Sequence, residues 1–157
     1  MIKDFGAELV VLSPGGARGV AAGTGDNTKV NGAIVDMQAT GLYGQPVSGI
    51  ITVMGSATLT ADKTLSILEL YIEHGDESNL SDAAEYTFGS ADTDYDDVIT
   101  GEAGGSTETF EVKQNVDLTG LKRYWRVTCK PDLDAANTDV FQLGFGCVCI
   151  ATEAPLS

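Results

Sequence analysis

The ten residues from Leu65 to His74, LSILELYIEH, alternate between apolar and polar side chains and decide the fold class. One side of an extended chain receives Leu68, Leu70 and Ile72, and the other side receives Glu69, Tyr71 and Glu73. This two-residue period predicts a strand with a buried apolar face and a charged outer face. A helix over the same residues would mix the two glutamates into the apolar stripe, so the pattern favours the strand.

Strand candidates of the same kind flank this segment on both sides. They occupy 7–12, 29–37, 47–54, 98–100, 108–118, 122–129 and 140–150. About eight short strands separated by turn residues are typical of two packed antiparallel sheets. The sequence therefore predicts an all-β fold, an antiparallel β-sandwich that is jelly-roll-like. Its 157 residues fit a single domain over 1–157.

Two local features bear on the details of this sandwich. Ser81 or Asp82 can cap a single helical turn that runs to Glu85, and no long helix is expected anywhere. In the last strand, Gly144 and Gly146 lie opposite the apolar side chains, which indicates close packing or a bulge.

The segment 13–27, SPGGARGVAAGTGDN, contains five glycines and shows no periodicity. We expect an irregular Gly/Ala-rich N-terminal arm or long loop, because such segments are uncommon inside a compact domain unless they have a function. The arm either stays flexible or orders against a neighbouring subunit, and its candidate interface residues are Ser13, Pro14, Arg18 and Asn27. A strand follows these glycines where a phosphate loop would lead into a helix, so no nucleotide or other cofactor is predicted.

Acidic residues dominate the charge of the chain. Asp and Glu number 23 against 9 Lys and Arg, which gives a net charge of −14. Such a surface repels phosphate backbones and anionic lipid, so neither nucleic acid nor a membrane is expected as a partner. The acids are dispersed, which serves solubility or steers the protein toward a basic surface. The start of the chain does not resemble a signal peptide, and no run of about 20 apolar residues occurs.

Residue types that support catalysis are scarce. His74 is the single histidine, and nucleophilic catalysis needs a base beside the nucleophile and a group that orients the base. The three cysteines, Cys129, Cys147 and Cys149, are odd in number and lie in apolar strands. We expect buried thiols in a reducing compartment, and no enzymatic activity.

Three aspartates are spaced like the opening of a calcium loop. Asp92, Asp94 and Asp96 alternate along the chain, but the sixth position is Asp97 where an EF-hand has Gly, and the twelfth is Ala103 where it has Glu. An EF-hand is therefore excluded. The three residues remain weak candidates for a looser divalent-ion site, and a solvated acidic loop is the alternative.

Basic residues are densest in the segment LKRYWRV, at 121–127. Arg123 and Arg126 can pair with acids on an adjacent strand of the same chain or with acids on a partner. We treat both as candidate interface residues.

Two resemblances extend this interpretation. The segment VDLTGLKRYWRVTCKPD, at 116–132, is similar to the late strands of many jelly-roll modules, some of which bind carbohydrate. The segments SPGGARGVAAGTGDNTKVNG, TLTADKTLSILELYIEHGDES and VDLTGLKRYWRV, followed by PDLDAANTD, together resemble a group of small proteins encoded among tailed-phage head genes. The second resemblance implies a decoration or cement protein, often a trimer, that binds the major capsid protein.

Made in the host cytoplasm, such a protein would reside on the capsid surface of the virion. The alternatives are a head–tail connector or tail component and, in a different class, a carbohydrate-binding β-sandwich module.

Overall fold

The computed structural model describes residues 18–21, 27–37, 46–86, 95–134 and 139–151, and these ranges contain strands, turns and loops but no helix. No helix in these ranges is therefore long and apolar enough to cross a membrane. Ten strands are present: β1 (Arg18–Ala21), β2 (Val30–Asn31), β3 (Val35–Asp36), β4 (Pro46–Leu59), β5 (Thr64–Gly75), β6 (Ala84–Tyr86), β7 (Tyr95–Thr100), β8 (Ser106–Asp117), β9 (Tyr124–Asp134) and β10 (Val140–Ala151).

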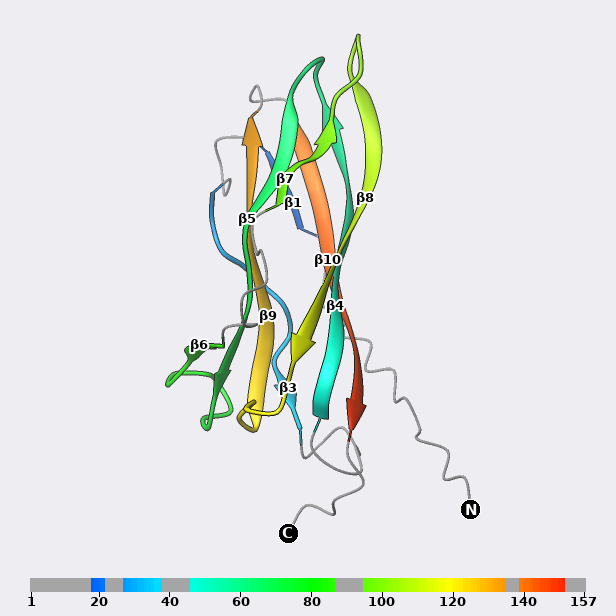
Figure 1. Cartoon of the computed structure of the whole chain (residues 1–157). Helices are drawn as coiled ribbons and strands as arrows, with labels where there is room; N and C mark the ends of the chain where they lie inside the picture. The colour runs from blue at the N-terminus through cyan, green and yellow to red at the C-terminus, as the bar shows by residue number, and fades with distance from the viewer. Residues whose placement is uncertain (1–17, 22–26, 38–45, 87–94, 135–138, 152–157) are drawn as a thin grey trace, which may run out of the picture.

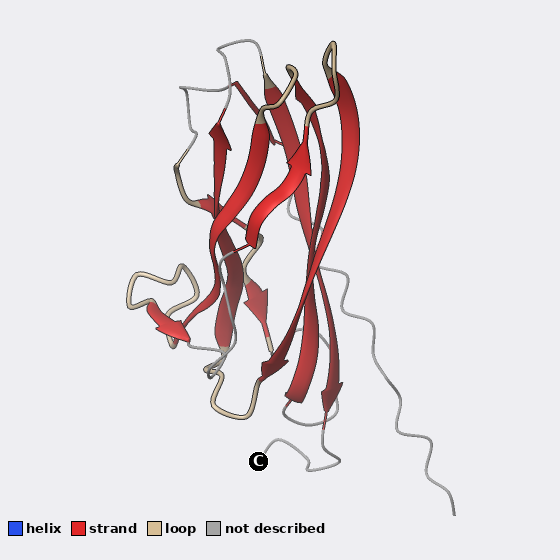
Figure 2. Cartoon of the chain, turned by 45° about the horizontal axis from the view of Figure 1, so that its top comes forward, coloured by secondary structure: helices blue, strands red, loops and turns tan. Residues whose placement is uncertain are grey.

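The strands form two antiparallel sheets that pack face to face, as Figures 1 and 2 show. Sheet A has the order β1-β10-β4-β8, and sheet B has the order β2-β9-β5-β6. In sheet B, β3 also lies beside β9 and β7 beside β5. The long strands β4, β8 and β10 belong to sheet A, and the long strands β5 and β9 belong to sheet B. The predicted antiparallel β-sandwich is confirmed.

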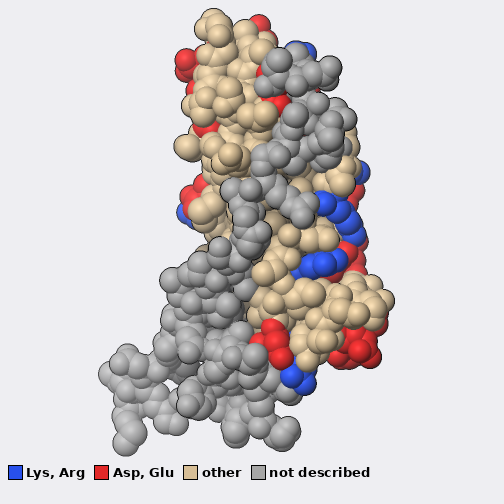
Figure 3. Space-filling model, turned by 180° about the vertical axis from the view of Figure 1, so that it is seen from behind, with Lys and Arg blue, Asp and Glu red and all other residues tan. Residues whose placement is uncertain are grey.

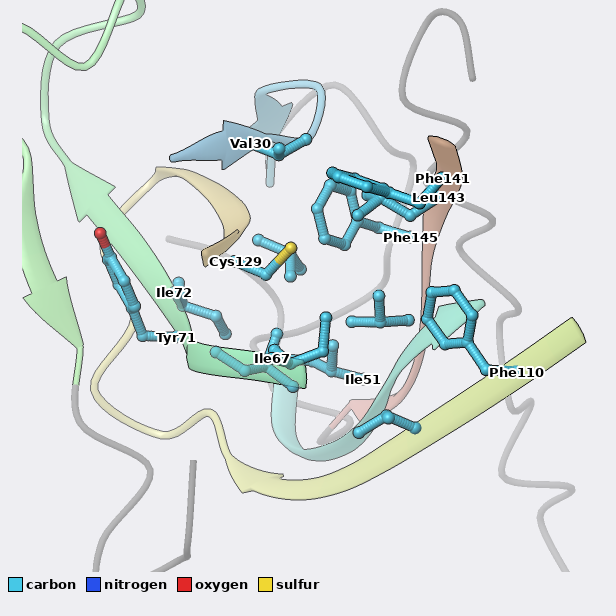
Figure 4. Packing of buried hydrophobic residues seen from close by; sticks show 14 of the residues in the cluster. Val30, Ile51, Ile67, Tyr71, Ile72, Phe110, Cys129, Phe141, Leu143 and Phe145 are labelled. Atoms are coloured by element: carbon cyan, nitrogen blue, oxygen red, sulfur yellow. The ribbon is translucent and has the colours of Figure 1, made fainter. Parts of the chain in front are cut away.

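The core lies between the sheets and follows the period of two. Strand β10 contributes Phe141, Leu143 and Phe145, which face Val30 and Cys129 of sheet B in Figure 4. The inward residues that the sequence predicts over β8, the residue after it and β9 are also buried: Phe110, Val112, Val116, Leu118, Trp125, Val127 and Cys129. Burial of these side chains is the main source of stability for such a sandwich.

The alternation in β5 differs from the prediction at one position. Ile67 pairs with Pro131 and Glu69 with Lys130, so Leu68 is an extra residue in a β-bulge and is only half-buried. Pro131 has no N–H to donate, which favours an interruption of the ladder at this point. The bulge shifts the phase, so the inward residues are Leu65, Ile67, Leu70 and Ile72.

The structure departs from two further predictions about the loops. The expected helical turn near Ser81 and Glu85 does not form; Asp82 instead accepts hydrogen bonds from the backbone N–H groups of Asp76 and Glu77, and β6 follows. The expected strand at 98–100 begins earlier, at Tyr95, where the ring hydroxyl donates a hydrogen bond to Gln114 of β8.

Part of the predicted arm is regular. Residues Arg18–Ala21 form β1, an edge strand that pairs with Val140–Leu143 of β10, so the segment 13–27 is not irregular throughout. Its residues 13–17 and 22–26 lie outside the described ranges, as does the strand candidate at 7–12.

Candidate functional site

The outer face of sheet A carries no charged side chain on its two central strands. Its described residues define the neutral face: Ser48, Ile50, Thr52, Met54, Ser56 and Thr58 of β4, and Val140, Gln142, Gly144 and Gly146 of β10. Charges on this side lie on the edge strand β8, where Glu111 and Lys113 pair with each other at 2.8 Å. Solvated faces of antiparallel sheets usually carry polar side chains, and this face combines Ser, Thr and Gln with three exposed apolar residues but carries no charge.

The neutral face has apolar projections beside an open strip. Met54, Ile50 and Val140 are 47%, 42% and 39% exposed. On the adjacent strand, a Cβ atom added at Gly144 would meet nothing within 4 Å. One added at Gly146 would touch only the Met54 methyl carbon, at 4.0 Å. Close packing therefore does not explain these two glycines, and no register shift lies between Val140 and Ile150, so the prediction of close packing or a bulge is wrong.

The outer face of sheet B is charged, and most of its charges form ion pairs. We define the charged face as Lys29, Glu69, Glu73, Arg126, Lys130 and Asp132. In Figure 3, which views the molecule from behind, Lys and Arg side chains gather along the right-hand side, which sheet B forms. The two outer faces of the sandwich are therefore chemically different.

Glu73 is the centre of the charged face. Its carboxylate accepts hydrogen bonds from Lys29 Nζ at 2.7 Å and from Arg126 Nε at 2.8 Å, and Arg126 Nη2 lies 2.6 Å away. Burial alone would raise the pKa of Glu73, but the hydrogen bonds from the two cations outweigh burial and lower the pKa below its usual value. The Lys29 ammonium also lies over the Tyr71 ring, 5.1 Å from its centroid.

The Lys29 and Arg126 side chains lie over β5, and they explain why two of its outward residues are buried, which the alternation did not predict. Tyr71 and Glu73 point outward from β5 yet are buried, and in Figure 4 the Tyr71 ring lies to the left of the other labelled side chains of the cluster. Thr128, their neighbour on β9, is also fully buried on the outer side and donates a hydrogen bond to Asn31.

Of the two roles predicted for the basic segment, the structure shows the intramolecular one. Arg126 pairs with Glu73, its register partner on β5, and Arg123 donates two hydrogen bonds of 2.9 Å to the Asp36 carboxylate. An interface role for Arg123 and Arg126 stays a prediction.

One end of the molecule carries a surplus of acids. We define the acidic end as Asp76, Glu77, Asp82 and Glu85, which are exposed around the β5–β6 loop. The Lys122 ammonium lies 2.7 Å from the Asp76 carboxylate and 4.0 Å from that of Asp82. The Asp82 carboxylate accepts hydrogen bonds from backbone N–H groups, and these bonds, above all the one from Asp76, lower the pKa of Asp82. The Asp82 carboxylate is therefore held charged where it closes the loop.

His74 lies beside this loop and is half-buried. Its Nδ1 accepts a hydrogen bond from the Lys122 backbone N–H, and its ring meets the Tyr86 ring edge-on at 5.0 Å. Burial, followed by the Lys122 charge, lowers the pKa of His74. The histidine thus has a packing role at the base of the loop.

The remaining predicted residues are spread over the molecule. Asn27 adopts a left-handed backbone conformation, and its side chain donates a hydrogen bond to Asp132 at 2.8 Å. Arg18 begins β1, but its side chain lies outside the described set, and Ser13 and Pro14 lie outside the described residues altogether. The structure therefore does not bring these candidate interface residues together.

The metal candidates fall almost wholly outside the described part of the chain. Asp92 and Asp94 lie there, and only the backbone of Asp96, in β7, is described. Among the described side chains, no three of His, Cys, Asp and Glu form a group that could hold a metal ion. Cys129 is buried as predicted, and burial raises the pKa of its thiol to about 12, whereas the side chains of Cys147 and Cys149 are not described.

The neutral face is the feature that the sequence analysis missed. The sequence does indicate this face at 48–58, because no residue from Ser48 to Thr58 is charged. The same run was interpretable as a strand buried on one or both faces, and only the sheet order shows that one side is open.

Comparison with known proteins does not identify a family for the chain. No protein-family model matches the chain. No curated protein matches it either. Among solved structures, the xylan-binding domain CBM22-1 of Xyn10C from Paenibacillus barcinonensis has a TM-score of 0.29 and 11% identity, over 89% of this chain and 85% of that one.

Proposed function

We propose that the protein is a structural virion protein that decorates the head of a tailed phage, binding the capsid as a homo-oligomer. The observation that supports this proposal is the unequal distribution of charge. The outer face of sheet A is uncharged along β4 and β10, whereas acids are displayed on the edge strand β8, on sheet B and at the acidic end. A decoration protein needs separate surfaces for its neighbours and for the shell, and this sandwich offers two of different chemistry.

Capsid attachment, in this proposal, uses the acidic end. Four exposed carboxylates, two of them beside the Lys122 ammonium, create a negative local potential that attracts a basic patch on the shell. The charged face is less suited to this role, because its Glu69 and Glu73 carboxylates already pair with Lys29, Arg126 and Lys130.

Co-sedimentation with heads tests the proposal. Heads of the phage that carries the gene, prepared without this protein, are mixed with the purified chain and pelleted at increasing salt. The wild-type chain is expected to pellet with the heads and to be released as salt screens the attraction. Glu77→Lys should weaken binding several-fold at low salt.

The matched control is Glu102→Lys, the same exchange at an exposed position in the turn between β7 and β8. If both variants bind like the wild type, the acidic end does not contact the shell. If the wild-type chain never pellets with heads but is retained by a glycan array, the decoration role is wrong and the carbohydrate-binding alternative replaces it.

A further inference from the structure

We infer that two copies of the chain pair through the neutral face. In this arrangement β4 of one copy lies over β10 of the other, about a twofold axis that runs along the strands. The pairing needs no capsid and is a property of the isolated protein.

Charge favours a second copy as the occupant of this face. Each chain carries a net charge of −14, so two copies repel each other wherever their acidic surfaces meet. At physiological ionic strength, salt largely screens charges that are more than about 8 Å apart, so repulsion persists between surfaces in contact. The central strands of sheet A place no charge at the contact, which lets like copies approach there. A basic partner, by contrast, would be attracted to the acidic end.

The register of the two strands makes the face self-complementary. Met54 of β4 is the register partner of Gly144 of β10, and Thr52 is the partner of Gly146, so each projection lies beside an open position at the same height. A twofold axis midway between β4 and β10 and parallel to them places β4 of one copy over β10 of the other. Met54 of each copy then lies against Gly144 of its partner, and the same contact forms twice.

The space above the glycines suits this contact. Aligned sheets pack about 10 Å apart, and side chains from both faces fill the interval. Nothing lies within 4 Å of a Cβ position at Gly144, and Met54 is an unbranched side chain that adapts to irregular gaps. Ile50 and Val140, both exposed, extend the apolar strip along the two strands.

The test is the mass of the full-length protein in solution, measured by light scattering and sedimentation over a dilution series. The wild-type chain should show twice the chain mass at high concentration and the chain mass on dilution. Met54→Asp places two carboxylates in the contact and should weaken association about 100-fold or more, because two methionine side chains lose their burial.

Gly144→Leu should weaken pairing without adding a charge, since its side chain occupies the site of the partner's Met54. Ile34→Asp is the control: Ile34 is similarly exposed, at 39%, but lies between β2 and β3, away from the neutral face. This variant should pair like the wild type. Urea unfolding of each variant, followed by far-ultraviolet circular dichroism, verifies that it is folded.

Three outcomes would overturn the inference: a wild-type chain that stays monomeric, a mass three times that of the chain, or a Met54→Asp variant that still pairs. The threefold mass would favour the trimer that the phage resemblance implies. None of these outcomes bears on binding through the acidic end, which the head co-sedimentation measures separately.

Discussion

Replacing Glu73 with Gln tests how the charged face is held together. The exchange preserves the shape of the side chain but removes the charge that Lys29 and Arg126 neutralise. Glu73 is buried, with 8% of the residue exposed, so its cations lose a partner that water only partly replaces. We expect the variant to fold with reduced stability.

The geometry sets the size of the effect. A hydrogen bond to a charged group contributes about 1.5–3 kcal/mol, and breaking a fully buried ion pair costs about 3–5 kcal/mol. The Lys29 side chain is half exposed, which places Glu73→Gln below the fully buried case. The free energy of unfolding should therefore fall by about 2–3 kcal/mol, which lowers Tm by roughly 4–12 °C in a chain of this size.

Urea unfolding at a fixed protein concentration measures this loss through the fluorescence of Trp125, the single tryptophan, which is 1% exposed. Glu69→Gln on the same strand is the matched control, because its pair with Lys130 is longer, at 3.3 Å, and more exposed. The control should lose less than about 1 kcal/mol. Equal losses in the two variants would refute the central role of Glu73.

The lowered pKa of Glu73 adds a pH dependence with a definite sign. A carboxylate whose pKa is lower in the folded state stabilises the protein above its unfolded-state pKa, and this stabilisation is lost as pH falls through the folded-state value. The difference in unfolding free energy between the wild type and Glu73→Gln should be constant near neutral pH. It should shrink below the ordinary pKa of 4.5. A difference that grows on acidification would contradict this assignment.

Two further predictions concern packing. Gly55→Ala should lower the free energy of unfolding, measured with urea, by at least about 2 kcal/mol, because the added Cβ would lie 1.9 Å from the Gln142 backbone oxygen on β10. Gly144→Ala faces open space and should change this free energy by less than about 0.5 kcal/mol. Cys129 should resist iodoacetamide in the folded protein and react once urea unfolds it, since burial keeps its thiol protonated; peptide mapping that finds Cys129 alkylated without denaturant would refute this.

The two-residue alternation was enough to predict the sandwich, because a solvated antiparallel sheet has one buried and one exposed face. Large apolar residues such as Trp125 and Phe141 mark the buried face in the sequence, and both are buried in the structure. The bulge at Leu68 was not predictable from β5 alone. It depends on Pro131, a residue of the neighbouring strand that is more than sixty positions away in sequence. Pairing between distant segments decides such details.

The same limit applies to the candidate site. Arg126 was identified as a paired cation from its own segment, but its partner Glu73 and the covering Lys29 come from two other strands or their borders. The neutral face needs the sheet order before it is visible, because Met54 and Gly144 become neighbours only when β4 and β10 pair. Composition predicted a protein that works through its surfaces, and topology was needed to find which surface.

The most direct test of the neutral face as a contact surface is nuclear magnetic resonance of the protein labelled at its methionine methyl groups. The chain has three methionines, and Met37 provides an internal reference because it packs against the core and accepts a hydrogen bond from Trp125. As concentration rises through the range in which the mass doubles, the Met54 methyl signal should shift or broaden while the Met37 signal stays in place. A Met54 signal that is unchanged over this range would contradict the account.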